Sequence, residues 1–224
     1  MAFHPFSEDV SSLMSGADTF ICSNMLTTTP SHLTKTLIAN ERAGLDNIDV
    51  APNQGKLLYL LAKLCHAQNI LEVGTLGGYS AIWFAQALES SSTGKVVSLE
   101  IDPKHAEVAR ENIKSAGYEA NIEVRVGPAL ESLAEMESEG WGKESKKVDM
   151  VFIDADKANN VGYLEYGLKF ARKGAVIVVD NVGRNGRISD TWKGEVDKSI
   201  LGKGTAVQTV GCKGWDGFSI ALVC

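Results

Sequence analysis

The feature that most constrains this chain is a regular alternation of short apolar runs and amphipathic segments from residue 53 onward. The runs at 70–73, 95–100, 122–126, 148–154 and 175–180 have the length and composition of buried strands. Segments with helical spacing of apolar residues precede, separate or follow them, at 54–67, 79–88, 103–116, 130–139 and 163–171. Such an alternation predicts a parallel, doubly wound sheet with right-handed crossovers.

The two ends of the chain have a different pattern. The β-rich runs 205–210 and 218–223 have no helix between them, so we expect an antiparallel pair. Residues 1–50 predict helices that cap the fold without adding strands; one of them, at 31–42, places Leu33, Leu37 and Ile38 on one face. We therefore expect a single α/β domain over 1–224, made of a helical cap (1–50) and a core (51–224).

Composition narrows the function classes. The 224 residues carry a net charge of −6, which argues against a nucleic-acid partner because phosphate backbones need a surplus of lysine and arginine. No apolar run has the length of a bilayer span, and no basic segment followed by an apolar one opens the chain. The four cysteines form no CxxC pair. We therefore expect reduced thiols, a cytoplasmic protein and no membrane partner.

A glycine-rich segment follows the first expected strand. Residues 72–80 read Glu-Val-Gly-Thr-Leu-Gly-Gly-Tyr-Ser, and glycines here let the backbone turn sharply and lie against a ligand. The spacing is not the G-x-G-x-x-G of dinucleotide sites. Glu100 ends the second strand, where an acidic side chain accepts hydrogen bonds from a ribose. The two features together predict a nucleoside-type ligand; the alternative is a tight turn without a ligand.

Polar oxygen-bearing side chains end the fourth and fifth strands. Asp154 closes one of them, and Asp180 and Asn181 close the other. If these strands are neighbours, their ends lie about 4.8 Å apart and all three side chains can meet on one ion. Carboxylate and amide oxygens suit Mg²⁺, with Mn²⁺ or Ca²⁺ as alternatives of the same chemistry. The alternative interpretation is that these residues only form turns or helix caps.

Lys157 lies three residues beyond Asp154, so a single turn places it on the same side, facing the metal. The alternative for Lys157 is a solvated surface position, which is where most lysines lie. Asp156 is interpreted as a helix-start residue or a structural partner, without a catalytic role.

These residues resemble a known family, the cation-dependent class I O-methyltransferases, which include caffeoyl-CoA and catechol O-methyltransferases. The similarity runs from about residue 47 to 223, and the D-A-D-K run with a later D-N is its most specific part. It is carried by residues 51–55, 71–80, 100–102, 127–130, 151–157, 180–181 and 217–218. It implies a Rossmann-like methyltransferase fold with a mostly parallel seven-stranded sheet, helices on both faces and an antiparallel terminal strand pair.

The resemblance also implies roles for particular residues. It places the metal on Asp154, Asp180 and Asn181 and makes Lys157 the general base. It implies a homodimer whose N-terminal segment helps to shape the acceptor pocket. It assigns contacts with S-adenosylmethionine to Asp49, Val50, Glu72, Gly74, Ser80, Glu100, Ala129 and Asp154.

This chain departs from the family around the acceptor. Asn160 stands where many relatives have tyrosine, and Val182-Gly183 replaces a bulky Leu-Trp pair. Arg184 and Arg187 follow, and two readings stay open: they favour acidic or phosphate-bearing acceptors, or they point to solvent.

The expected reaction is in-line transfer of a methyl group from S-adenosylmethionine to one hydroxyl of a small aromatic vicinal diol of the catechol, flavonoid or hydroxycinnamoyl type. A phenol with a pKa near ~10 is mostly protonated at neutral pH, so chelation by a divalent metal and proton removal by Lys157 would activate it. Two rivals are an NAD-dependent oxidoreductase, disfavoured by the missing G-x-G-x-x-G, and a non-catalytic protein that binds S-adenosylmethionine.

Overall fold

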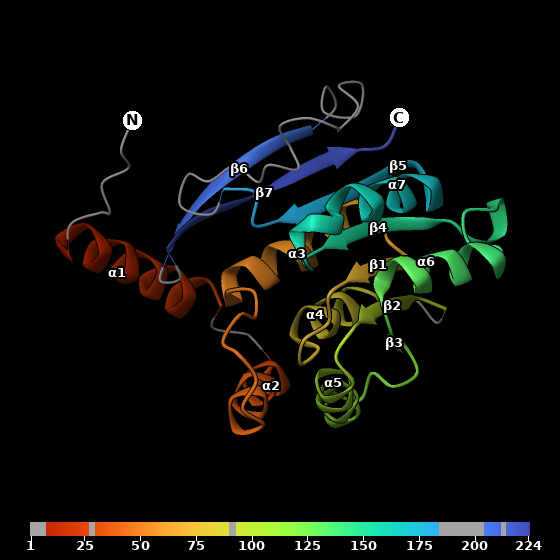
Figure 1. Cartoon of the computed structure of the whole chain (residues 1–224). Coiled ribbons are helices and arrows are strands. Elements are labelled where there is room, and N and C mark those ends of the chain that lie inside the picture. Colours follow the sequence, from red (N-terminus) through yellow and green to blue (C-terminus); the bar gives the residue numbers. More distant parts are fainter. Residues whose placement is uncertain (1–7, 27–29, 90–92, 184–203, 212–213) are drawn as a thin grey trace.

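The computed structural model of the chain describes residues 8–26, 30–89, 93–183, 204–211 and 214–224 (Figure 1). Its centre is a seven-stranded sheet with the strand order β3-β2-β1-β4-β5-β7-β6. The strands are β1 (Asn69–Val73), β2 (Lys95–Glu100), β3 (Ile122–Val126), β4 (Val148–Ile153), β5 (Ala171–Asp180), β6 (Gly204–Gly211) and β7 (Gly214–Leu222).

Helices cover both faces of this sheet (Figure 1). The described helices are α1 (Glu8–Met25), α2 (Ser31–Arg42), α3 (Pro52–Leu64), α4 (Tyr79–Ala87), α5 (Pro103–Ala116), α6 (Ala129–Ser138) and α7 (Asn160–Phe170), with short 3₁₀ turns η1 (Glu144–Lys146) and η2 (Lys157–Asn159). The helix α1 lies to one side of the molecule and contacts β6 and α3.

The strands pair as the sequence predicts. The strands β3, β2, β1, β4 and β5 are parallel, and β7 joins β5 and β6 in antiparallel register. The element bounds differ from the expected ones by a few residues. The strands β5 and β7 begin earliest relative to expectation, each by four residues. β5 begins at Ala171 because Ala171 already pairs with Val148 before a register shift in the β4–β5 ladder.

Alternating side chains of the central strands build two separate cores. Ile70 and Val96 face α2–α5, and their core includes Trp83 and Phe84 of α4. Leu71 and its neighbours on the opposite face pack against α6 and α7. Because both faces are covered, β1 and β4 are buried in nearly every position, as expected of a buried parallel sheet.

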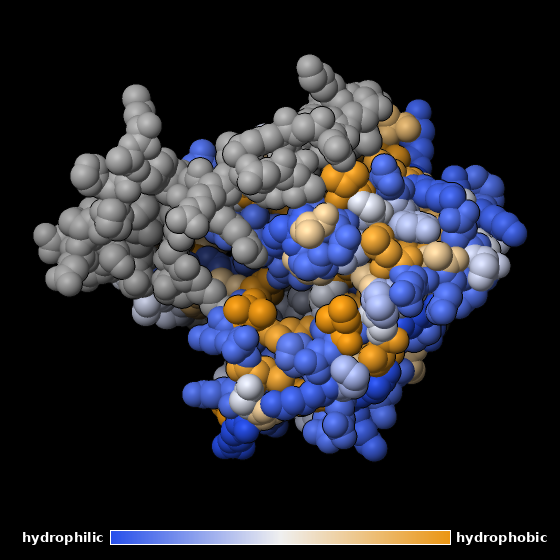
Figure 2. All heavy atoms as spheres, viewed as in Figure 1, coloured by the Kyte–Doolittle hydropathy of each residue, from blue (hydrophilic) through white to orange (hydrophobic). Residues whose placement is uncertain are grey.

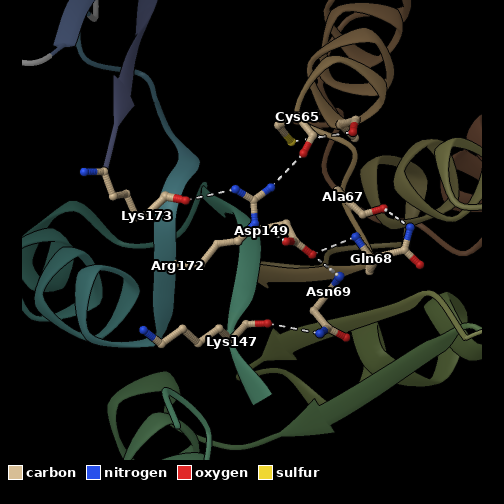
Figure 3. Close-up of polar contacts among 9 residues, drawn as sticks. Cys65, Ala67, Gln68, Asn69, Lys147, Asp149, Arg172 and Lys173 are labelled. Atoms are coloured by element: carbon tan, nitrogen blue, oxygen red, sulfur yellow. Dashed lines mark hydrogen bonds and ion pairs between the residues drawn. The ribbon is translucent and has the colours of Figure 1, made fainter. Parts of the chain in front are cut away.

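A cluster of polar residues lies at the amino-terminal ends of the central strands (Figure 3). The Asp149 carboxylate in β4 accepts hydrogen bonds from the backbone N–H groups of Gln68 (2.7 Å) and Asn69 (2.8 Å), just where β1 begins. Arg172 donates its Nε to the same carboxylate and one terminal nitrogen to the carbonyl of Cys65 (2.8 Å). The cluster thereby joins the end of α3 to β1, β4 and β5.

Other expectations have mixed outcomes. Within the described part of the chain, no helix is long and apolar enough to cross a membrane. Cys22, Cys65 and Cys224 are free thiols, whereas Cys212 lies outside the described residues, as do Arg184 and Arg187. The cytoplasmic location and the division into cap and core stay predictions.

We expect Arg172→Met to lower the free energy of unfolding by about 1–2 kcal/mol. The change removes three hydrogen bonds, to Asp149 and to the carbonyls of Cys65 and Lys173, and it leaves Asp149 with only its backbone donors. Arg172 is partly exposed, so water offsets some of the loss. Urea denaturation measures the effect, and the exposed neighbour Lys173→Met is the control. Equal stability of the two variants would contradict the assigned role of the cluster.

Candidate active site

A cavity of about 1110 Å³ lies at the carboxyl ends of β1, β2, β4 and β5. This is where open α/β sheets bind ligands, because the strand order reverses there and the loops diverge. Figure 2 shows that this face of the molecule is hollowed near its centre, where hydrophobic and hydrophilic surfaces meet. The residues predicted from sequence that line the cavity are Asp49, Val50, Gly74, Ser80, Glu100, Ala129, Asp154, Asp180 and Asn181.

The glycine turn after β1 brings the ends of β1 and β4 together. Gly74 has a φ of +99°, and a Cβ at this position would lie 2.1 Å from the carbonyl oxygen of Asp154. Only glycine combines this backbone angle with so close an approach. The N–H of Asp154 donates to the carbonyl of Val73 (2.8 Å), which holds the two strand ends in register.

The Glu100 carboxylate is 6% exposed and lies against the same turn. Its Oε2 accepts hydrogen bonds from the N–H groups of Thr75 (3.1 Å) and Leu76 (2.8 Å), and its Oε1 accepts one from Asp102 (3.0 Å). The Nδ1 of His105 lies 3.6 Å from Oε1. The carboxylate lines the cavity and keeps further acceptor capacity, which suits the hydroxyls of a ribose.

Glu72 lies behind the cavity wall. It is fully buried, is not among the lining residues, and accepts a hydrogen bond from the Ser98 hydroxyl at Oε2. Its Oε1 accepts no hydrogen bond of normal geometry. Burial raises the pKa of Glu72 to about 7, although the nearby Ser80 and Ser98 hydroxyls favour the ionised form. Glu72 therefore supports the turn from inside, and its predicted contact with the donor stays a prediction.

A chain of buried amides holds the other wall of the cavity. Asn40 of α2 donates from Nδ2 to the Asp49 carboxylate (3.0 Å) and accepts at Oδ1 from Asn112 of α5 (2.8 Å). Asn112 also donates to the carbonyl of Gly77 (2.9 Å). A Cβ on Gly77 would lie 1.9 Å from Asn40 Oδ1, so this glycine makes room for the amide. The network couples the loop at Asp49 to the glycine turn.

Asp154 and Asp180 end adjacent parallel strands at the same level. The last pair of the β4–β5 ladder joins Ile153 with Val179, one residue before each aspartate. Burial raises the pKa of Asp180 to about 6, and the Asp154 carboxylate adds to the rise. Hydrogen bonds from the Asn181 N–H and from Gln54 act in the opposite direction. Two carboxylates this close favour a cation between them.

Asn181 and Lys157 complete the group predicted from sequence. Asn181 has a φ of +57°, a left-handed conformation that asparagine tolerates, and its side chain lines the cavity. Lys157 begins η2 and places Nζ 3.4 Å from Asp154 Oδ1. Asp154, Asp180 and Asn181 thus line one end of the cavity, on the side of β5, and Lys157 lies directly beside Asp154 without lining the cavity itself.

Asp156 has the structural role that its position predicts. Its carboxylate accepts hydrogen bonds from the Tyr163 hydroxyl and from Asn159 Nδ2 (2.7 Å). These bonds fix the turn between β4 and α7, and with it the position from which Lys157 projects.

Sequence reasoning missed several residues at the site. Asn40 and Gln54 support the cavity from helices, while Ile101 and Asp216 line it from strand ends. For Asn40 a signal existed, because it continues the apolar face of α2 seven residues after Leu33 and a polar residue on such a face needs a partner. Asp216 and Ile101 gave no such signal, because only the folded sheet brings them to the cavity.

The arrangement can hold two molecules of different character. A cavity of this size exceeds that of a typical single-ligand site. The side near Glu100 offers hydroxyl acceptors and the exposed apolar side chain of Ile101. The side near Asp180 offers oxygen ligands for a cation and one lysine amine.

The chain is similar to known proteins in sequence and in structure. Residues 26–204 match the model of a family described as O-methyltransferase. A catechol O-methyltransferase from Mycobacterium tuberculosis is 45% identical over 217 residues, which cover 92% of this chain and 94% of that protein.

Solved structures agree with this match. An O-methyltransferase from Bacillus cereus in complex with SAH superposes with a TM-score of 0.85 at 42% identity, covering 96% of this chain and 100% of that one. An O-methyltransferase from Streptomyces achromogenes involved in tomaymycin synthesis, in complex with SAM, has a TM-score of 0.84 at 36% identity, covering 97% and 99%.

The buried Glu72 generates a prediction about stability and pH. The pKa of Glu72 in the folded protein is about 7, above the ordinary 4.5. The protonated carboxyl group therefore contributes fully to the free energy of unfolding below pH 4.5, and this contribution is lost as the pH rises through 7. We expect this loss to be on the order of 3 kcal/mol by pH 8. Glu72→Gln should therefore gain stability relative to the native protein between pH 5 and pH 8.

Urea denaturation across that pH range measures the difference. Glu107→Gln, at an exposed position of α5, is the control and should show no such trend. If the difference in free energy of unfolding between Glu72→Gln and the native protein stayed constant across this pH range, the raised pKa of Glu72 would be excluded.

Proposed function

This chain belongs to the O-methyltransferase family, and we propose that it transfers a methyl group from S-adenosylmethionine to one hydroxyl of an aromatic vicinal diol held by a divalent metal. The observation that carries the proposal is a single cavity lined by Glu100 at one end and by Asp154, Asp180 and Asn181 at the other. Lys157 lies beside this second group, with Nζ 3.4 Å from Asp154 Oδ1.

The donor half of the cavity fits S-adenosylmethionine. The Glu100 carboxylate would accept hydrogen bonds from the ribose hydroxyls, and the Ile101 side chain would lie against the adenine ring. Asp49 and Val50, held by Asn40, would enclose the methionine end, with Gly74, Ser80 and Ala129 completing the wall. When bound, this donor supplies a methyl group on a positively charged sulfur. The solved relatives in complex with SAH and SAM support this ligand over NAD.

The metal half fits a hard divalent cation. Asp154, Asp180 and Asn181 offer two carboxylates and an amide oxygen, a donor set suited to Mg²⁺. Burial raises the pKa of Asp180, and the negative charge of Asp154 adds to the rise, so a cation bound between the two carboxylates would favour their ionised forms. When bound, the cation would lower the pKa of a coordinated hydroxyl and orient a vicinal diol. The name of the mycobacterial relative supports a catechol as the acceptor.

Lys157 would take the proton of the reacting hydroxyl at Nζ as the oxygen attacks the methyl carbon. The S–CH₃ bond breaks as the O–CH₃ bond forms, and the sulfur keeps the electron pair. Asp154 positions the lysine at 3.4 Å, and the hydrogen bonds of Asp156 hold the turn that carries it. Fixing the two reactants in line contributes to the rate, by up to about 7–11 kcal/mol in the most favourable cases.

We also propose that the protein is a homodimer. Phe20 and Met25 of α1 are 68% and 73% exposed, and a second copy of the chain would cover such apolar side chains of the N-terminal helix. Light scattering, which gives the mass of the particle in solution, tests this assignment.

Removal of the metal should abolish turnover. We expect EDTA to stop methylation of catechol, caffeic acid and caffeoyl-CoA, and Mg²⁺ or Mn²⁺ to restore it, because the acceptor hydroxyl is then again acidified and positioned. Methyl transfer from labelled S-adenosylmethionine measures turnover, and its binding in EDTA is the control for an intact donor site. Full turnover after thorough metal removal would refute the metal role.

Lys157→Ala should depress kcat by roughly 100-fold or more, the usual contribution of a general base. The affinity for S-adenosylmethionine should stay within about twofold, because Lys157 lies beside Asp154 and is not among the residues that line the donor half of the cavity. Lys104→Ala, at an exposed position of α5, is the control. Turnover near the native value would reduce Lys157 to a structural partner of Asp154.

A further inference from the structure

The motif at 51–55 contains polar residues that the reaction does not use. Its proline begins α3, and a Cβ on Gly55 would lie 2.3 Å from the Trp83 indole, so these two residues serve packing. Asn53 donates to Asp18 of α1 (2.8 Å). Gln54 instead reaches across the cavity and donates from Nε2 to Asp180 Oδ2 (2.8 Å). A residue in the first turn of α3 thereby contacts the end of β5.

This contact fixes the rotation of the Asp180 carboxylate. Its Oδ1 accepts a hydrogen bond from the N–H of Asn181 (2.8 Å), while Oδ2 accepts the one from Gln54. Each oxygen therefore has one lone pair engaged within the protein and retains another for a ligand. The carboxylate is held at both oxygens, so its plane cannot turn freely.

A second contact decides which atom of Asn181 faces the cation. The amide Nδ2 donates to Asp216 Oδ2 (3.2 Å), and a carboxylate can only accept, so the amide oxygen must point the other way. Asp216 is itself held, because its Oδ1 accepts from the N–H groups of Gly183 (3.1 Å) and Gly217 (2.8 Å). The start of β7 thus orients a side chain at the end of β5.

We propose that Gln54 and Asp216 are positioning residues of the metal site: Gln54 sets the plane of the Asp180 carboxylate, and Asp216 directs the amide oxygen of Asn181 toward the cation. The inference rests on the proposed metal role. Partners that orient metal ligands typically contribute 10–100-fold to metal affinity. The two residues come from opposite walls of the cavity, so each can be tested without the other.

The test is a titration of the protein with Mn²⁺ alone, followed by electron paramagnetic resonance. Gln54→Met keeps the length of the side chain and removes the donor to Asp180. Asp216→Asn keeps an oxygen for the two glycine N–H groups but turns an NH₂ toward that of Asn181. Two donors repel each other, so the Asn181 amide should flip and present NH₂ to the cation.

We expect both variants to bind Mn²⁺ 10–100-fold more weakly than the native protein. The affinity for S-adenosylhomocysteine and the thermal unfolding midpoint in EDTA should not change. Gln86→Met, in α4 and outside the cavity lining, is the matched control and should bind Mn²⁺ normally. If Asp216→Asn fails to fold, Gln54→Met alone decides.

The outcomes separate this inference from the function on which it rests. If the native protein binds no Mn²⁺, the proposed metal site itself is wrong. If the native protein binds Mn²⁺ and the variants bind it equally well, the positioning roles are wrong. Weaker Mn²⁺ binding accompanied by an equal loss of S-adenosylhomocysteine affinity would also overturn the proposal, because the residues would then support the whole cavity.

Discussion

The close approach of β1 and β4 at their carboxyl ends is the constraint on which the rest of the site depends. The carbonyl oxygen of Asp154 occupies the space that a side chain at residue 74 would need, and the Asp154 N–H is bonded to Val73. This contact places the glycine turn and Asp154, the first of the proposed metal ligands, next to each other at the point where the strand order reverses. The proposed donor half and metal half of the cavity would therefore share one wall, as a transfer between two bound molecules requires.

The helices α2 and α3, which precede the first strand, also hold residues of the cavity in place. Asn40 of α2 holds the loop at Asp49, and Gln54 of α3 holds Asp180. Each is a neutral amide that donates to a carboxylate, so it orients the charge without adding another one. The N-terminal segments thereby act on both halves of the cavity, although they supply no strand to the sheet.

Two carboxyl groups at this site, those of Glu72 and Asp180, are buried away from water. Burial raises the pKa values of Glu72 and Asp180, which means that the folded protein without ligands holds carboxyl groups in places that disfavour their ionised forms. A cation at Asp180 would offset part of that cost. At the amino-terminal ends of the strands, by contrast, Asp149 is paired with Arg172 and with two backbone N–H groups. There the carboxylate stabilises the fold and has no role in the cavity.

The sequence by itself determined the alternation of elements, the parallel sheet with its antiparallel end, and the segments that carry Gly74, Glu100, Asp154 and Asp180. These follow from periodicity and from turn chemistry, which are local. Only the tertiary structure decided which side chains support them, because Gln54 lies 126 residues from Asp180, and Asn181 lies 35 from Asp216. The same holds for the burial of Glu72, whose contact with the donor, implied by the family resemblance, stays a prediction. Contacts between segments far apart in the chain depend on how the helices pack on the sheet. Hydrophobic periodicity reports only on the local element, so it does not predict which of these side chains meet.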